Sequence, residues 1–235
     1  MTYLNKILKT IPILAVSAFL YSLIMRDMVA MYIHPRFTML TLITALGLFL
    51  VGVSFLRPDR KRLHEHATPW AILLVVALPV VLGWMVPPRP LGASAMENRE
   101  VNYATLSSNA VSRATTQEFS SGEKTILDWL SQFGTGPAAS FNGEEATLVG
   151  FVYYDDLFES DTFMVSRFIV SCCTADGSPV GLIVRYEGSD QLPLDQWVEI
   201  SGTFEAQDFN GTDIPILQVT ELKEIEPPRQ PYLYP

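Results

Sequence analysis

The chain has 235 residues, of which 49% are hydrophobic and 17% charged, and its formal net charge is −9. This hydrophobic share and a positive mean hydropathy are high for one soluble core. We therefore expect part of the chain to lie in a membrane. The chain has two cysteines, which are too few for a disulfide scaffold.

Three apolar stretches predict a transmembrane region over residues 1–90. Residues 37–56 and 67–88 hold twenty and twenty-two residues without a charge, and a helix needs about 20 to cross the hydrocarbon core. Residues 10–25 are shorter, and their basic start also suits a cleaved signal peptide. We favour a retained helix because the apolar run continues beyond a cleavage point. We therefore expect helices near 7–26, 37–56 and 68–87.

The distribution of cations predicts the orientation of this region. Three spans would place the N-terminus and the 57–68 loop on the same side of the membrane. This side carries more cations than the other, so we expect it to face the cytoplasm. The six cations of that side are Lys6, Lys9, Arg57, Arg60, Lys61 and Arg62. The prediction is a multi-pass protein of the cell membrane, with its N-terminus in the cytoplasm and its C-terminal domain outside. The second and third spans hold no ionisable residue of the kind that marks an ion path, so they indicate an anchor or an accessory subunit.

After the third span, residues 91–140 are rich in Ser, Thr, Ala and Asn and are expected to form a tether. Apolar residues at helical spacing near 122–133 predict a short amphipathic helix within it.

From residue 141 the hydrophobic period changes to two, which predicts β-strands. Five windows near 145–154, 162–173, 180–186, 197–205 and 214–222 are separated by turn residues. Five short strands favour an all-β small barrel of the OB type over 141–235, with an extended tail. The 187–196 connection is too short for the helix that this barrel usually carries there, so a sandwich is the alternative. The predicted fold class is thus a multi-domain membrane protein, with a three-helix transmembrane region before the barrel.

Charge and residue types exclude two classes of function. Residues 141–226 hold three basic residues against seventeen acidic ones, which repels phosphate backbones, so we expect no nucleic-acid partner. The three histidines, His34, His64 and His66, all lie in the first half. The C-terminal domain therefore lacks the commonest general base, and no catalytic motif is present, so we expect no enzyme.

The only two cysteines, Cys172 and Cys173, are adjacent. If their strand ran unbroken, Cys172 would share the core face with Phe168 and Val170, and Cys173 would be exposed. If instead the strand ended there, Cys172, Cys173 and Asp176 could converge on a metal ion such as zinc, with three ligands where a structural site takes four. Two apolar structural cysteines are the competing interpretation.

Two further groups are weaker candidates for cation binding. His64 and His66 lie two apart in the basic loop, and such a pair can ligate a transition metal. The acidic turn 155–161 offers carboxylates to a hard cation, but it lacks the spacing of an EF-hand loop, and a solvated turn is the preferred interpretation.

The sequence resembles the YcgQ-like family of bacterial membrane proteins, which are described as permease subunits. The matching segments are LPVVLGWMVPPRPLGASAMENR (78–99), GFVYYD (150–155), RFIVSCCTAD (167–176), WVEISGTF (197–204) and PYLYP (231–235). The resemblance implies helices in the lipid bilayer, a β-domain and a polytopic permease-like partner. It also implies metal handling through a histidine-rich loop, of which only His64 and His66 are present here.

The leading hypothesis is a non-enzymatic accessory subunit of a membrane permease with an acidic β-domain outside the cell, linked to metal ion handling. One alternative is a membrane-anchored metal or redox sensor that uses the Cys-Cys pair. Another is a cell-surface ligand-binding barrel with an aromatic platform of Trp197, Tyr153 and Tyr154.

Overall fold

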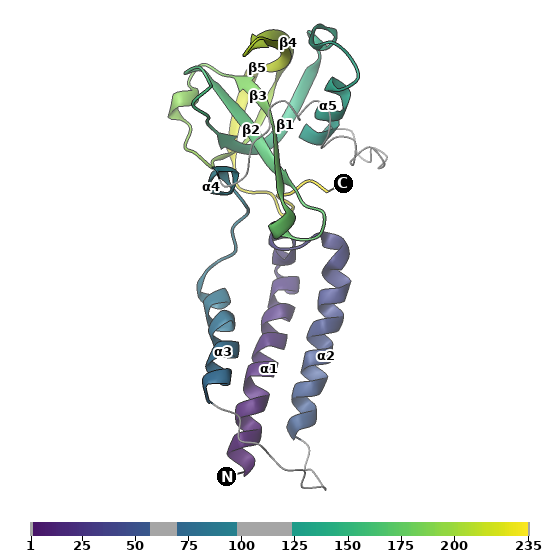
Figure 1. Ribbon diagram of the computed structural model, residues 1–235, viewed down its shortest axis with the longest axis vertical. Coiled ribbons are helices and arrows are strands. Elements are labelled where there is room, and N and C mark those ends of the chain that lie inside the picture. Colours follow the sequence, from purple (N-terminus) through teal and green to yellow (C-terminus); the bar gives the residue numbers. More distant parts are fainter. Residues whose placement is uncertain (1, 57–69, 98–123, 235) are drawn as a thin grey trace. The chain divides into compact units, whose positions relative to one another are not determined.

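The structure is a computed structural model that describes residues 2–56, 70–97 and 124–234. The chain divides into two compact units, Met1–Arg89 and Pro90–Pro235. Figure 1 shows that the first unit consists of helices and that the second carries the sheet.

The described residues of the first unit form three α-helices. They are α1 (Thr2–Met25), α2 (Thr38–Leu56) and α3 (Trp70–Met85), with short 3-10 turns at Met28–Met31 and Pro35–Phe37. The Ser17 hydroxyl on α1 donates a 2.8 Å hydrogen bond to the carbonyl oxygen of Ala45 on α2. A Cβ atom at Gly52 would lie 2.6 Å from the Leu14 side chain. Small residues therefore let α1 and α2 approach closely, as they do in membrane helix pairs.

The structure corrects the predicted three-helix transmembrane region. Among the described residues, one helix, Pro35–Leu56, is long and apolar enough to cross a membrane, and the apolar helix Thr10–Met25 is shorter. The sixteen residues of α3 rise about 24 Å, less than the roughly 30 Å of a hydrocarbon core. The first residues of the predicted 68–87 helix lie outside the described part of the chain. Within the described residues, the third predicted span therefore extends only over Trp70–Met85 and does not reach the length of a crossing helix.

The second unit is built on five strands in its described residues. They are β1 (Glu145–Tyr153), β2 (Thr162–Ile169), β3 (Ser178–Arg185), β4 (Trp197–Phe209) and β5 (Thr212–Ile225). They close into a barrel in the order β1-β2-β3-β5-β4. Only β3 and β5 run parallel, and they pair at just two positions, whereas the other neighbours are antiparallel. The sheet is therefore mixed. The predicted fold class is corrected in its membrane part: it places three transmembrane helices before the β-domain, whereas the described residues contain one candidate span.

A tight turn at Asn210 and Gly211 fixes the register of β4 and β5. Both residues have positive φ, 53° and 83°, as a two-residue hairpin turn of the Asn-Gly type requires. The resulting hairpin is the longest in the sheet, and it pairs Phe209 with Thr212 at its tip.

Helix α5 (Ile126–Phe133) packs on the hydrophobic cluster inside the barrel. Thr125 and Asp128 form a capping box at its start, which satisfies free amides of the first turn. The ring of Trp129 lies 4.7 Å from that of Phe204 on β4. This helix supplies apolar cover that the short 187–196 connection, which holds only the 3-10 turn Ser189–Gln191, does not provide.

The outer face of β1, β2 and β4 carries a second hydrophobic cluster, which the short helix α4 (Ala93–Glu97) and the C-terminal tail cover. Leu233 exchanges backbone hydrogen bonds with β2 and the residue after it: its N–H donates to Phe168 at 2.8 Å, and its carbonyl accepts from Val170 at 2.9 Å. The Arg167 Nε donates to the carbonyl of Pro231 at 3.0 Å. The PYLYP terminus therefore closes the domain by packing.

Candidate functional site

The turn between β2 and β3 is organised by Asp176. One carboxylate oxygen accepts the N–H of Cys172 at 2.8 Å, and the other accepts the N–H of Ser171 at 3.1 Å. The N–H of Asp176 in turn donates to the carbonyl of Cys173 at 3.0 Å. An Asp side chain that bonds to the backbone in this way competes with strand pairing. β2 accordingly ends at Ile169, before the cysteines.

The prediction that Cys172 is the core residue and Cys173 the exposed one is wrong. Cys172 is exposed and Cys173 is partly buried, whereas Phe168 and Val170 are fully buried. Alternation of faces holds only while the chain stays extended, and the Asp176 turn interrupts it. Because the strand ends before the cysteines, the two thiols and the carboxylate can lie close together.

The three donor atoms do converge. The Sγ atoms of Cys172 and Cys173 are 3.7 Å apart, and these atoms and a carboxylate oxygen of Asp176 all lie within 4.8 Å of one another. Two thiolates bound tetrahedrally at a Zn–S distance of about 2.3 Å would be about 3.8 Å apart. The observed sulfur separation therefore matches that of two thiolate ligands of one zinc ion. Within the described residues, no second group of three such donors lies this close.

The protonation of this cluster follows from its hydrogen bonds. The bond to Asp176 and the bond to Cys173 raise the pKa of the Cys172 thiol from its ordinary 9.0 to about 11. Burial acts to raise the pKa of Asp176, but the bonds it accepts from the Cys172 thiol and from three backbone amides outweigh that effect and lower it. Without a cation the thiol is thus protonated at neutral pH. A bound metal ion would displace the proton, since thiolate is the ligand form.

The other predicted cation ligands do not join this cluster. His64 and His66 lie outside the described residues. In the acidic turn, the Arg185 guanidinium holds Glu159 at 2.7 Å and Asp161 at 3.2 Å. Two of the turn's carboxylates are therefore paired with a cation of the protein itself.

The predicted aromatic platform does not lie on the surface. Trp197 and Tyr153 are buried, with 5% and 9% of their surface exposed. The Tyr154 hydroxyl donates to the carbonyl of Leu192 at 3.0 Å, which fixes that ring against the loop. These aromatic residues stabilise the domain and do not form an exposed surface for a ligand.

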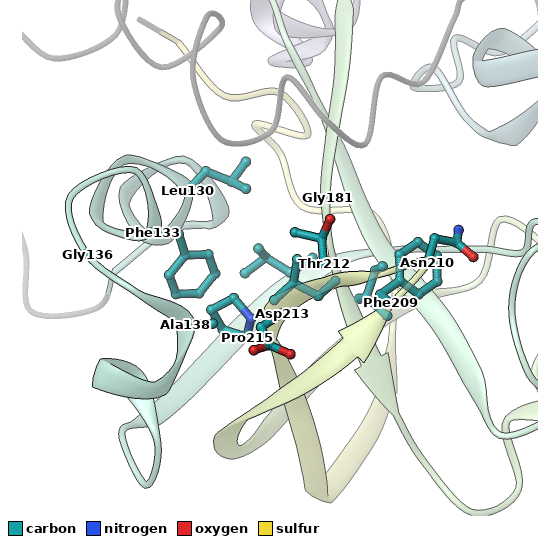
Figure 2. Close-up of a pocket in the computed structure, with 13 residues that line it drawn as sticks. Leu130, Phe133, Gly136, Ala138, Gly181, Phe209, Asn210, Thr212, Asp213 and Pro215 are labelled. Carbon is teal, nitrogen blue, oxygen red and sulfur yellow. The ribbon is translucent and has the colours of Figure 1, made fainter.

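A cleft of about 450 Å³ is a feature that the sequence did not predict. It lies between α5, β3 and the β4–β5 hairpin, and Figure 2 shows Leu130 and Phe133 on one side of it and Thr212 and Asn210 on the other. Its walls come from segments far apart in the sequence, so no local motif could reveal it.

Together these observations define a protein with an apolar helical unit and a five-stranded β-domain that presents a Cys-Cys-Asp turn. The chain belongs to the DUF1980 C-terminal domain family, whose family model matches residues 98–235. This match and the relatives below confirm the resemblance to the YcgQ-like family.

Two relatives are similar at low identity. The UPF0703 protein YcgQ of Bacillus subtilis (strain 168) is 28% identical over 123 residues, which cover 51% of this chain and 40% of that protein. A Streptococcus mutans protein, provisionally named a two-component membrane permease complex subunit, is 22% identical over 246 residues, or 86% of this chain and 90% of that protein. The chain thus matches less than half of the Bacillus relative.

Among solved structures, an OBody bound to hen egg-white lysozyme matches 37% of this chain and 85% of its own chain. Its sequence identity is 19% and its TM-score 0.27, a score too low to support an inference.

Proposed function

We propose that this chain is a non-enzymatic accessory subunit of a membrane permease complex, and that its β-domain binds one zinc ion through Cys172, Cys173 and Asp176. The observation that carries the metal assignment is the 3.7 Å separation of the two Sγ atoms, beside a carboxylate that lies within 4.8 Å of both. Thiolate and carboxylate together suit zinc, which accepts both sulfur and oxygen ligands.

The accessory role is supported by the Streptococcus relative, which carries a permease-subunit name and aligns over most of both chains. The apolar helix Pro35–Leu56 is consistent with attachment to a membrane. Three protein ligands leave one coordination position of a tetrahedral ion open, for water or for a ligand from a partner. An exposed, open site suits an ion that is acquired and released.

The metal proposal is tested on the full chain, purified in detergent without chelator. We expect about one zinc per chain by elemental mass spectrometry, and a zinc affinity at least about tenfold lower in Cys172→Ser and in Cys173→Ser, since each loses a thiolate ligand. Asp156→Asn removes an exposed carboxylate from the loop before β2, away from the cysteine turn that follows it, and serves as the matched control. If no zinc binds, or if both serine variants keep the affinity of the unmodified chain, the metal assignment fails.

The partner proposal is tested by isolating the tagged full chain from gently solubilised membranes. We expect a polytopic membrane protein to co-purify in a fixed ratio, and to do so equally with the Cys172→Ser, Cys173→Ser double variant, because the thiols bind metal and not the partner. Loss of the partner in that variant would show that assembly depends on the thiols. Absence of any stoichiometric partner would remove the permease assignment and leave the zinc result intact.

Placement of the β-domain outside the cell is part of the proposal, and the two cysteines report on it directly because the chain has no others. A membrane-impermeant maleimide, added to intact cells after a chelator has removed zinc from the two thiols, is expected to label the full chain. Labelling that appears only after the cells are opened would place the domain inside.

A further inference from the structure

The cleft between β3 and β5 exists because these strands pair over only part of their length. β3 pairs with β2 from Ser178 to Arg185, and β5 pairs with β4 over its whole span. With each other, β3 and β5 pair only at Val184 and Arg185 of β3 in the described chain. Pro215, which has no N–H to donate, lies in β5 beside the cleft. On the N-terminal side of these two paired positions, the edge of β3 that faces β5 and the edge of β5 that faces β3 therefore form no strand pairing with each other.

Such edges present regularly spaced backbone N–H and C=O groups, which an added strand can pair with. On the β3 side, the open edge runs over Ser178–Ile183, in which Pro179 has no N–H to donate, and Gly181, Leu182 and Ile183 line the cleft. A small molecule cannot match a row of backbone groups at strand spacing, whereas an extended peptide can. The backbone of the cleft therefore favours a peptide.

The side chains around the cleft indicate the chemistry of that peptide. Leu130 and Phe133 of α5 and Ile214 of β5 give apolar walls, and Figure 2 shows the Leu130 and Phe133 side chains directed toward the strands. Among the described residues that line the cleft, Asp213 is the one charged residue, and it is exposed. The surrounding residues 141–226 hold seventeen acidic and three basic residues. Charge complementarity thus favours a basic segment that also carries apolar side chains.

We propose that this cleft binds an extended, basic and apolar peptide segment of a partner protein, which pairs with the open edge of β3. Alternate side chains of the segment pack between α5 and the β4–β5 hairpin, and a lysine or arginine reaches Asp213. This inference does not depend on the zinc site or on the identity of the permease.

The experiment uses the full chain in detergent and a fluorescent peptide of alternating lysine and valine, with binding measured by anisotropy. One control peptide replaces alternate valines by proline, which cannot donate main-chain hydrogen bonds, and another replaces lysine by glutamate. We expect both controls to bind at least about tenfold more weakly. Amide hydrogen exchange within residues 178–183, of which Pro179 has no amide hydrogen, is expected to slow when the lysine peptide binds, because the edge becomes paired.

Two neighbouring alanines provide matched variants. Ala138 lines the cleft, whereas Ala139 is exposed and does not. Ala138→Phe fills the cleft and should weaken binding at least about tenfold, while Ala139→Phe should leave it unchanged. Asp213→Asn should weaken it about two- to fivefold, as the loss of an exposed ion pair does.

Equal binding by Ala138→Phe and Ala139→Phe would overturn the proposal, as would protection that falls outside residues 178–183. Equal binding of the proline peptide would also overturn it, because attraction to the acidic surface would then suffice. A hydrophobic dye that occupies the cleft where the peptide does not would make it a site for small molecules instead.

Discussion

The hydrogen bond between Asp176 and the Cys172 thiol makes a quantitative prediction about thiol reactivity. It contributes most to raising the pKa of Cys172 from 9.0 to about 11, so Asp176→Asn should return the pKa toward its ordinary value. Two pKa units change the thiolate fraction below pH 9 about 100-fold, but nucleophilicity falls as the pKa falls, with a Brønsted coefficient of about 0.45. If Asp176 caused the whole shift, the two effects would leave a net increase of about tenfold in the rate of attack on a disulfide reagent, so an increase of up to about tenfold is expected.

The assay follows 2,2′-dithiodipyridine at about pH 8 in metal-free protein, on a Cys173→Ser background so that Cys172 is the single thiol. The background protein lacks the Cys173 bond that also raises the pKa of Cys172, so its pH–rate profile should have a midpoint between 9.0 and about 11. The midpoint should move down toward 9.0 in Asp176→Asn. Asp156→Asn removes the same charge elsewhere and should change neither value. Equal rates with and without Asp176, or a slower rate in its absence, would refute the assigned hydrogen bond. The raised pKa also affects stability. The native state holds the Cys172 proton more tightly than the unfolded chain, so this bond stabilises the native state below pH 9, and the stabilisation is lost as the pH rises through about 11.

Three further predictions concern stability and are measured by urea unfolding of the full chain, followed by circular dichroism. Leu233→Ala removes a buried tail residue and should lower the free energy of unfolding by about 2 to 4 kcal/mol, so a change below about 0.5 kcal/mol would show that the tail does not close the domain. Trp129→Ala should cost about 3 to 5 kcal/mol, because the ring, 2% exposed, links α5 to the barrel; a silent variant would mean that α5 contributes no cover. Gly202→Ala would place a Cβ 2.0 Å from the carbonyl oxygen of Gln218 and should cost about 1 to 3 kcal/mol, whereas Gly136→Ala, which meets only the Ser140 side chain at 3.2 Å, should change stability by less than about 0.5 kcal/mol. Equal costs of the two glycine substitutions would contradict the close approach of β4 and β5.

The sequence located the strands but not their pairing. Period-two alternation placed 197–205 in a strand, and β4 covers it, because alternation reflects burial of one face. The pairing of β3 with β5, and hence the cleft, joins residues more than thirty positions apart. Periodicity carries no information about such contacts. The number of spanning helices was overestimated for a related reason. An uncharged stretch gives only the maximum length of a helix, because the positions of the helix ends depend on local geometry.

The candidate metal site was predictable in composition and not in geometry. Cys172, Cys173 and Asp176 were identifiable because few residue types ligate zinc. Their arrangement depended on whether the strand continued, and Asp176 decides this by capping the backbone of Ser171 and Cys172. The rule that side chains alternate between the two faces of a strand failed here, because it holds only for an extended chain. A carboxylate four residues after a cysteine, before a Gly-Ser-Pro sequence, was the available signal that the strand ends.

β3 connects the two proposed sites, because it begins at Ser178, directly after the cysteine turn, and its open edge lines the cleft. Zinc bound at Cys172, Cys173 and Asp176 would fix the start of β3, so less conformational entropy would be lost when a peptide pairs with it. We therefore expect zinc to strengthen binding of the lysine–valine peptide about fivefold or more, and linkage requires the peptide to strengthen zinc binding by the same factor. The two affinities are measured on the full chain by titrating each ligand with and without the other. Cys173→Ser, which is expected to bind zinc at least about tenfold more weakly, should show no effect at a zinc concentration that saturates only the unmodified chain. A factor of one in both directions would mean that the turn is already rigid without metal and that the two sites work independently.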